Sequence, residues 1–103
     1  MEPNERKLLE KCLELFRGPR TFCRNRVAET AAGGYIDPRS PLAVRWCIVG
    51  AMDKFQPECG GARVGTTLSL VCHRLYETYD YVTVNNQRGK AAVVRVLREA
   101  LRT

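Results

Sequence analysis

Cys47, His73 and the pair Asn85-Asn86 occur in the chain order Cys, His, Asn, which is the order of the catalytic groups in one class of cysteine hydrolases. In that chemistry a thiolate attacks a carbonyl carbon, and a thiol near a helix N-terminus has the lowered pKa that such attack needs. However, Cys47 lies on an apolar stripe, where a free cysteine behaves as a small hydrophobic residue. His73 lies about 100° around its helix from Cys72 and points away from the core. We therefore predict no catalytic residue, and we rank a cysteine-dependent hydrolase third among the functions considered.

The cysteines do not have the spacing of a metal site. Structural zinc sites use pairs of ligands two to four residues apart, whereas these thiols are ten or more residues apart. An odd number of thiols without a regular framework predicts reduced cysteines and a cytoplasmic protein. We predict no metal and no cofactor, and we expect Cys59, in a segment rich in Pro and Gly, to be the exposed thiol of the set Cys12, Cys23, Cys47, Cys59 and Cys72.

Arginines carry most of the net charge of +6 and fall into two clusters. Arg95, Arg98 and Arg102 recur at i, i+3 and i+7, which places them on one helical face. Such a stripe can neutralise phosphates, and the guanidinium fork favours bidentate contacts. Against this, arginines on the outer face of a helix are mostly solvated, and those near its C-terminus stabilise the helix dipole. Glu99 also interrupts the stripe. The second cluster is Arg17, Arg20, Arg24 and Arg26.

The adjacent residues Asn85 and Asn86 favour a helix cap at the start of the last helix, because asparagine side chains satisfy free backbone amides and tolerate turns. The alternative is a polar pocket that they line together with Thr83 and Gln87. We favour capping. Nearby, Tyr79 and Tyr81 straddle the end of a helix, and partly exposed tyrosines are frequent anchors at protein interfaces.

The apolar periodicity predicts the elements that hold these residues. A first helix covers 4–16 and ends before Gly18-Pro19. Ser40-Pro41 has the signature of a helix start, so we predict a central core helix from there to Phe55, followed by a loop over 56–61. A third helix covers 63–79, with Thr66 or Thr67 as the alternative start because Gly65 weakens the first turn. An extended segment covers 82–84, and the last helix covers 88–101.

The segment 20–37 allows two interpretations. Gly33-Gly34 fits the turn of a short β-hairpin at 26–37, since positive φ costs little only for glycine. The competing interpretation is a short helix from Thr21 to Thr30. We favour the hairpin, with Trp46 packed against it. The predicted fold is therefore mainly α: one domain over 1–103, a bundle of about four helices with a short hairpin, and no membrane span.

The segment 37–52 contains Asp37-Pro38, Ser40-Pro41, the run from Ala43 to Cys47, and then Gly50, Ala51 and Met52. With this pattern it resembles a family of short bacterial and phage proteins described as a domain of unknown function with a Trp-Asn-Asp signature. The resemblance implies a shared fold and no established activity. The late block of the family pattern matches in part, since Asn85 and Gly89 are kept and Lys90 stands for Arg. Val84 and Asn86 stand where the signature has Trp and Asp, so the carboxylate of the signature is absent here. In the early block Ala28 is kept while Phe22 and Asn25 differ. The central block carries the match through Asp37, Pro38, Ser40, Pro41, Ala43, Val44, Arg45, Trp46, Cys47, Gly50, Ala51 and Met52.

These observations together predict a small, non-catalytic binding or regulatory module that acts by contact with another protein. On the resemblance, it would be a phage or mobile-element inhibitor of a host system. Contact with the phosphate backbone of a nucleic acid through the arginines ranks second. The predicted binding residues are Arg17, Arg20, Arg24, Arg26, Arg95, Arg98, Arg102, Tyr79 and Tyr81.

Overall fold

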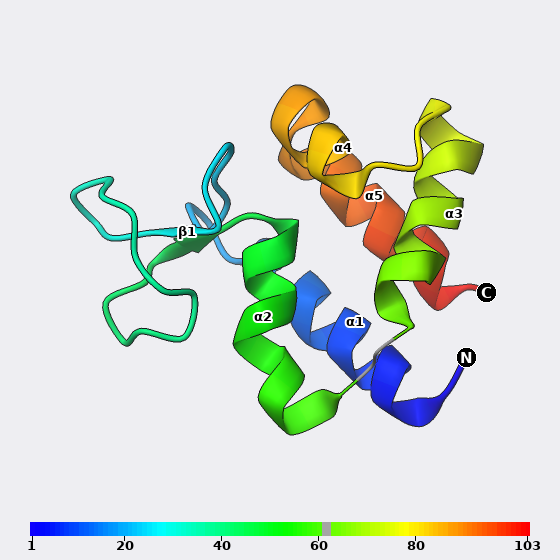
Figure 1. Ribbon diagram of the computed structural model, residues 1–103, viewed down its shortest axis with the longest axis horizontal. Helices are drawn as coiled ribbons and strands as arrows, with labels where there is room; N and C mark the ends of the chain where they lie inside the picture. Colours follow the sequence, from blue (N-terminus) through cyan, green and yellow to red (C-terminus); the bar gives the residue numbers. More distant parts are fainter. Residues whose placement is uncertain (61–62) are drawn as a thin grey trace.

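The computed structural model describes residues 1–60 and 63–103 and is mainly α-helical, as predicted. Figure 1 shows the helices gathered on one side and the two short strands, with their long loops, extending from the other. The elements in chain order are α1 (Pro3–Arg17), β1 (Ala28–Glu29), β2 (Arg45–Trp46), α2 (Ile48–Cys59), α3 (Val64–Tyr76), α4 (Tyr81–Arg88) and α5 (Lys90–Leu101).

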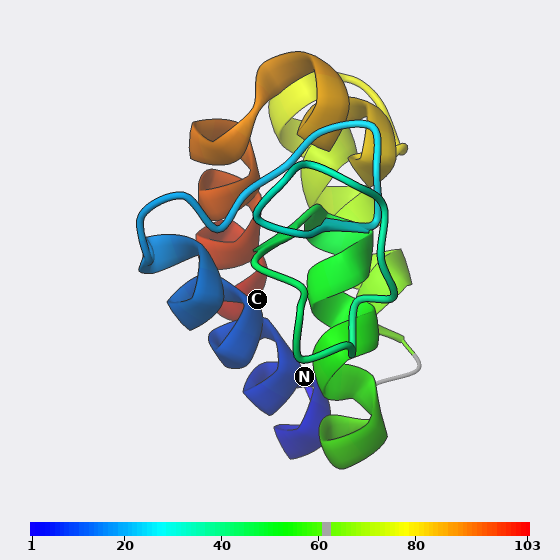
Figure 2. The same ribbon diagram turned by 90° about the vertical axis from the view of Figure 1, so that its left-hand side faces the viewer.

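Helix α1 confirms the first predicted helix and supplies one side of the core. Pro3 occupies the first helical turn, where its missing N–H costs nothing. Leu8, Leu9 and Phe16 are almost completely buried, and the helix packs against α2 and α5. Burial of each such side chain stabilises the fold by about 1.5–3 kcal/mol. Figure 2 shows α1 and α2 beside each other beneath the loops.

The two strands form a small antiparallel sheet in which Ala28 pairs with Trp46 and Glu29 with Arg45. The hairpin interpretation is confirmed, and the competing helix from Thr21 to Thr30 is wrong. The glycine turn is present, with Gly33 at φ +89°, but it closes only one bridge between Glu29 and Tyr35. The main partner of β1 comes from further along the chain.

The predicted helix start at Ser40-Pro41 is wrong. The Ser40 hydroxyl instead accepts a hydrogen bond from the Leu42 amide at 3.1 Å, which closes a turn, and the chain then enters β2. Helix α2 begins only at Ile48, with Cys47 as its N-cap residue. Serine satisfies a free amide in a turn as readily as at a helix start, so the motif alone does not separate the two.

The loop expected over 56–61 is wrong for residues 56–59, which complete α2, and Gly61 lies outside the described residues. Pro57 has no N–H for the carbonyl of Asp53, four residues earlier. The Arg39 Nε donates to that carbonyl at 3.1 Å instead, so the helix passes the proline without an unsatisfied acceptor. Cys59 is consequently buried between α1 and α2 and is not the exposed thiol we expected.

The extended segment expected at 82–84 is also wrong, because these residues belong to α4. Asp80 is the N-cap: its carboxylate accepts from the Val82 amide at 2.9 Å and from the Thr83 hydroxyl at 2.8 Å. These hydrogen bonds, chiefly that of Thr83, lower the pKa of Asp80. A good cap outweighs the weak strand preference of alternating β-branched residues. Gly89, at φ +85°, then lets the chain turn into α5, which matches the predicted last helix.

Helix α3 starts within one residue of the predicted 63 and not near Thr66 or Thr67, and it ends before the predicted 79. It begins at Val64 despite Gly65, because Val64 is buried in the core. It stops at Tyr76 because Glu77 adopts a left-handed conformation, at φ +60°. Within 1–60 and 63–103, no helix has the length and apolar character needed to cross a bilayer.

Candidate functional site

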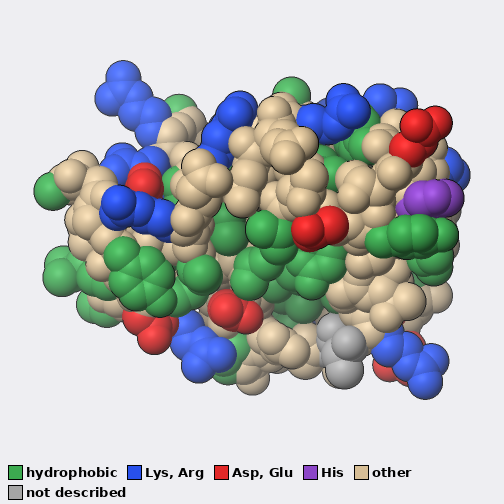
Figure 3. Space-filling model, turned by 45° about the horizontal axis from the view of Figure 1, so that its top comes forward, with side chains coloured by type: hydrophobic (Ala, Val, Ile, Leu, Met, Phe, Trp, Pro, Cys, Tyr) green, Lys and Arg blue, Asp and Glu red, His purple; other side chains and the backbone are tan. Residues whose placement is uncertain are grey.

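A cleft of about 400 Å³ lies where the loop before β1 meets α2 and α4. Its apolar walls come from three separate parts of the chain, through Val27, Val49 and Val82, and we call it the valine cleft. Figure 3 shows hydrophobic side chains gathered across the middle of this face of the molecule. The complete lining is Asn25, Arg26, Val27, Tyr35, Cys47, Val49, Val82 and Asn86.

The close approach of α2 to the loop creates one wall of this cleft. A Cβ atom on Gly50 would lie 1.8 Å from the carbonyl oxygen of Val27, so only glycine fits there. The Cys47 amide donates to the same carbonyl at 3.2 Å. Gly50 therefore allows the backbone contact that fixes Val27 beside the first turn of α2.

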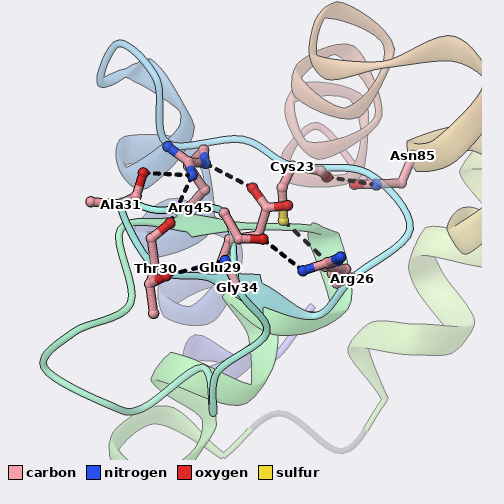
Figure 4. A network of polar contacts seen from close by, with 9 residues as sticks. Cys23, Arg26, Glu29, Thr30, Ala31, Gly34, Arg45 and Asn85 are labelled. Carbon is pink, nitrogen blue, oxygen red and sulfur yellow. Dashed lines mark hydrogen bonds and ion pairs between the residues drawn. The ribbon is translucent and has the colours of Figure 1, made fainter.

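Asn85 joins α4, α2 and the loop through one buried side chain. Its Oδ1 accepts from the Ile48 amide at 2.9 Å, which caps α2, and its Nδ2 donates to the Cys23 carbonyl at 3.2 Å (Figure 4). The predicted cap of the last helix is wrong, because the helix that Asn85 caps is α2 and not α5. The partner lies 37 residues away in sequence, beyond the reach of local patterns.

Asn86 lines the cleft and holds the loop at its edge. Its Oδ1 accepts from the Asn25 amide at 2.8 Å, and Asn25 adopts a left-handed conformation at φ +64°. The Arg24 Nη1 donates to the Asn86 carbonyl at 3.3 Å. The alternative polar pocket is wrong, because Asn86 lines a mainly apolar cleft, and Thr83, Asn85 and Gln87 do not line it.

A polar network holds the loop that connects β1 and β2 (Figure 4). The Arg45 Nε donates to Glu29 at 2.8 Å, and its Nη2 donates to the Thr30 carbonyl at 2.7 Å. The Trp46 indole N–H donates to the Pro38 carbonyl at 2.9 Å, so this tryptophan packs against the loop as predicted. Several residues in the central block of the family resemblance, among them Pro38, Arg45 and Trp46, thus take part in the hydrogen bonds that hold this loop.

Cys47 lacks the environment of a nucleophile. Burial raises the pKa of its thiol, and the hydrogen bond from the Gly50 amide, at 3.4 Å, offsets this only in part. His73 is exposed and stacks on Tyr79, with the ring centroids 4.1 Å apart. The Asn85 amide is occupied by the cap. This arrangement is the reverse of what an activated thiolate requires.

The other thiols are equally shielded, since all five cysteines are free and buried. Burial raises the pKa of Cys12 and of Cys23 to about 12. Among the described residues, no group of three His, Cys, Asp or Glu side chains is placed to hold a metal ion.

Most of the N-terminal arginine cluster is engaged in contacts within the protein. Arg17 pairs with Glu14 at 3.2 Å, and the Arg26 Nη1 donates to the Gly33 carbonyl at 2.6 Å. Arg24 contacts α4 as described above. Arg20, at φ +60°, is exposed and has no hydrogen bond or ion pair among the described residues.

The C-terminal arginines lie on α3 and α5, with Arg102 directly after α5. Arg95 and Arg98 are exposed on α5, as the spacing predicts. Arg102 pairs with Glu99 at 3.0 Å, and Arg74 from α3 approaches the same carboxylate at 3.6 Å. Within residues 1–60 and 63–103, these four arginines therefore have one carboxylate among them.

Sequence analysis missed the aromatic centre of this surface. The guanidinium carbons of Arg88 and Arg95 lie 4.4 and 5.8 Å from the ring centroid of Tyr76. Tyr76 is half-buried at the end of α3, and the two arginines come from α4 and α5. No local spacing joins these three residues, so only the packing of the helices identifies them.

The predicted tyrosines have different environments. Tyr79 is exposed and stacks on His73, whereas Tyr81 is half-buried and packs against the core beside Gly65. Sequence analysis did not select Tyr35, which lines the valine cleft with 68% of its surface exposed. In the sequence, the feature that could have identified Tyr35 as exposed is its position directly after the Gly33-Gly34 turn.

Comparison with protein-family models, with curated proteins and with solved structures finds no match for this chain. The resemblance of 37–52 to the Trp-Asn-Asp family stays a prediction.

Proposed function

We propose that this protein is a small, non-catalytic binding module that contacts another protein through the valine cleft. The observation that carries the proposal is an apolar cleft beside two exposed apolar side chains, Tyr35 and Val82. Concave, mostly apolar sites with a few polar groups at the edge are typical binding sites. Asn25 and Asn86 supply such polar groups here.

The size of the cleft suits one or two apolar side chains of a partner. A stable interface buries about 800 Å² on each partner, so the surrounding surface must also take part. Tyr35 has the character of an interface anchor, since tyrosine buries a large area and loses little side-chain entropy. We expect the partner to insert an apolar residue between Tyr35 and Val82.

The state of Cys47 supports binding over catalysis. It is the only thiol in the cleft lining, and its raised pKa keeps it protonated at neutral pH. On the family resemblance, the partner would be a host protein that a phage or mobile element inhibits. That partner class is an association through the family and not a mechanism.

Two valines of nearly equal exposure test the proposal. Val82 lines the cleft and is 39% exposed, and Val44 lies outside it and is 38% exposed. We expect Val82→Glu to lose a protein that the wild type retains from nuclease-treated lysate, because a carboxylate would enter the apolar cleft. Val44→Glu should retain that protein. Quantitative mass spectrometry of the two pull-downs measures the difference.

Folding must be unchanged for this comparison to hold. Val82 lies in the first turn of α4, where an acidic residue suits the helix dipole, so Val82→Glu should keep the thermal midpoint of the wild type. Equal retention of the partner by both variants, or equal loss, would refute the cleft as the binding site.

A further inference from the structure

A second surface of the molecule is strongly basic and lies outside the valine cleft. Residues 63–103 hold seven Lys and Arg against three Asp and Glu. Figure 3 shows Lys and Arg side chains at several places around the margin of the face that it draws. We call the surface that α3, α4 and α5 share the arginine face, defined by Arg74, Arg88, Arg95, Arg98 and Arg102.

Tyr76 lies beside two of these arginines. The guanidinium groups of Arg88 and Arg95 both lie over its ring, and neither forms an ion pair among the described residues. The aromatic ring attracts each cation, but the two cations repel one another. Bound phosphate groups would offset that repulsion, so both guanidinium groups are available to contact negatively charged groups beside the ring.

The remaining arginines extend this charge along α5. Arg74 and Arg102 share the single carboxylate of Glu99, and Arg98 has no ion-pair partner among the described residues. From Arg95 to Arg102 the helix rises by about 10 Å. A nucleic-acid strand carries one phosphate for roughly every 3.4 Å of its axis, so this length corresponds to about three phosphates.

We infer that the arginine face binds the phosphate backbone of a nucleic acid. The guanidinium fork matches phosphate oxygens bidentately, and Tyr76 orients two forks in advance. None of the five arginines belongs to a known base-reading arrangement, so binding is independent of sequence and sensitive to salt. This activity uses a different surface from the proposed protein contact, and the two proposals are tested by separate experiments.

Fluorescence anisotropy with a labelled 20-nucleotide single strand tests the inference. The variant Arg95→Gln with Arg98→Gln removes two charges from the arginine face and keeps good helix formers there. The matched control, Lys7→Gln with Arg63→Gln, removes two charges from exposed residues outside the arginine face that have no side-chain hydrogen bond or ion pair among the described residues. Circular dichroism and thermal midpoints show whether each variant is folded.

We expect the wild type to bind at 100 mM salt or below and the arginine-face variant to bind at least about tenfold more weakly. The slope of log affinity against log salt should fall by roughly two for that variant, because two phosphate contacts are lost. The control should stay within about twofold of the wild type.

Three results would overturn the inference. The first is an absence of binding by the wild type at low salt. The second is equal weakening in the control, which would mean that only net charge matters. The third is displacement of the strand by polyglutamate as effectively as by unlabelled DNA at equal charge, which would point to an acidic protein as the partner.

Discussion

The helical part of the molecule and the loop region between Gly18 and Cys47 are held together in different ways. The helices bury one continuous apolar core that includes Leu9, Phe16 and Leu97. The loop region has only two strands of two residues each, and side-chain hydrogen bonds from Arg45 and Asn85 fix its path. Ala28, Ala43 and Trp46 add to the core from the loop region, but the path of the loops between them depends on hydrogen bonds more than the helices do.

This difference explains where the valine cleft lies. Its walls come from both regions, since Val27 and Tyr35 belong to the loop while Val49 and Val82 belong to α2 and α4. The shape of the cleft consequently depends on contacts that can be lost without unfolding the core. The arginine face belongs to the helices alone and should be independent of the loop.

The largest effect should come from a cavity in the helical core. Leu9→Ala removes a fully buried side chain, and we expect a loss of about 4 kcal/mol in the free energy of unfolding. Because the core is shared, amide hydrogen exchange should increase in every helix and in the loop. Urea denaturation with hydrogen-exchange mass spectrometry measures both effects.

Leu42→Ala is the matched control for this experiment, since Leu42 is 66% exposed. Its free energy of unfolding should change by less than about 0.5 kcal/mol. A loss in Leu9→Ala below about 1 kcal/mol would show that apolar burial does not dominate the helical part.

A smaller and local effect should follow from Asn85→Ala. The substitution leaves the Ile48 amide without its acceptor and frees the loop at Cys23, which we expect to cost about 2 kcal/mol. Exchange should increase at 22–47 and in the first turn of α2, while α1 and α5 stay protected. Gln87→Ala, an exposed position on the same helix, should leave the exchange pattern unchanged.

A uniform increase across all helices in Asn85→Ala would contradict the separation of the two regions. The same variant also sharpens the functional proposals. It should weaken partner binding at the valine cleft, because the loop that carries Asn25 and Val27 loses its hydrogen bond from Asn85 to the Cys23 carbonyl. It should leave binding at the arginine face unchanged.

The two regions also differ in how well the sequence predicts them. The spacing of Leu8, Leu9, Cys12 and Phe16 encodes α1 locally, because every one of these residues lies within four turns of helix. The elements with an apolar stripe were therefore predicted. Ser40-Pro41 was misread because a hydroxyl can close a turn or start a helix, and only the pairing of Trp46 with Ala28 decides between them.

The candidate site follows the same rule. Sequence spacing identified Arg95, Arg98 and Arg102 as one face, since a single helix carries them. It could not find Tyr76 beneath Arg88 and Arg95, because three helices contribute to that contact. Long-range contacts of this kind depend on packing, which no local pattern records.

The smallest predicted effect concerns the cap of α4, which no contact with the loop supports. Asp80→Ala should lose about 1 kcal/mol at neutral pH, because the Val82 amide loses its acceptor. Hydrogen bonds, chiefly from Thr83, lower the pKa of the folded carboxyl below its usual 3.8. Its contribution is therefore fully present above pH 3.8 and disappears as the pH falls through the lowered value. The difference between wild type and Asp80→Ala, measured by urea denaturation, should shrink over that range.

Thr83→Val separates the two parts of this cap. It removes the hydroxyl that donates to Asp80 at 2.8 Å but keeps the carboxylate and its bond from the Val82 amide. The pKa of Asp80, followed by NMR titration of the side-chain carboxyl, should rise toward its usual value, and the loss of stability on acidification should move to higher pH. An unchanged pKa in Thr83→Val would show that the amide alone lowers it, and the cap would then be an ordinary helix start without the added hydroxyl.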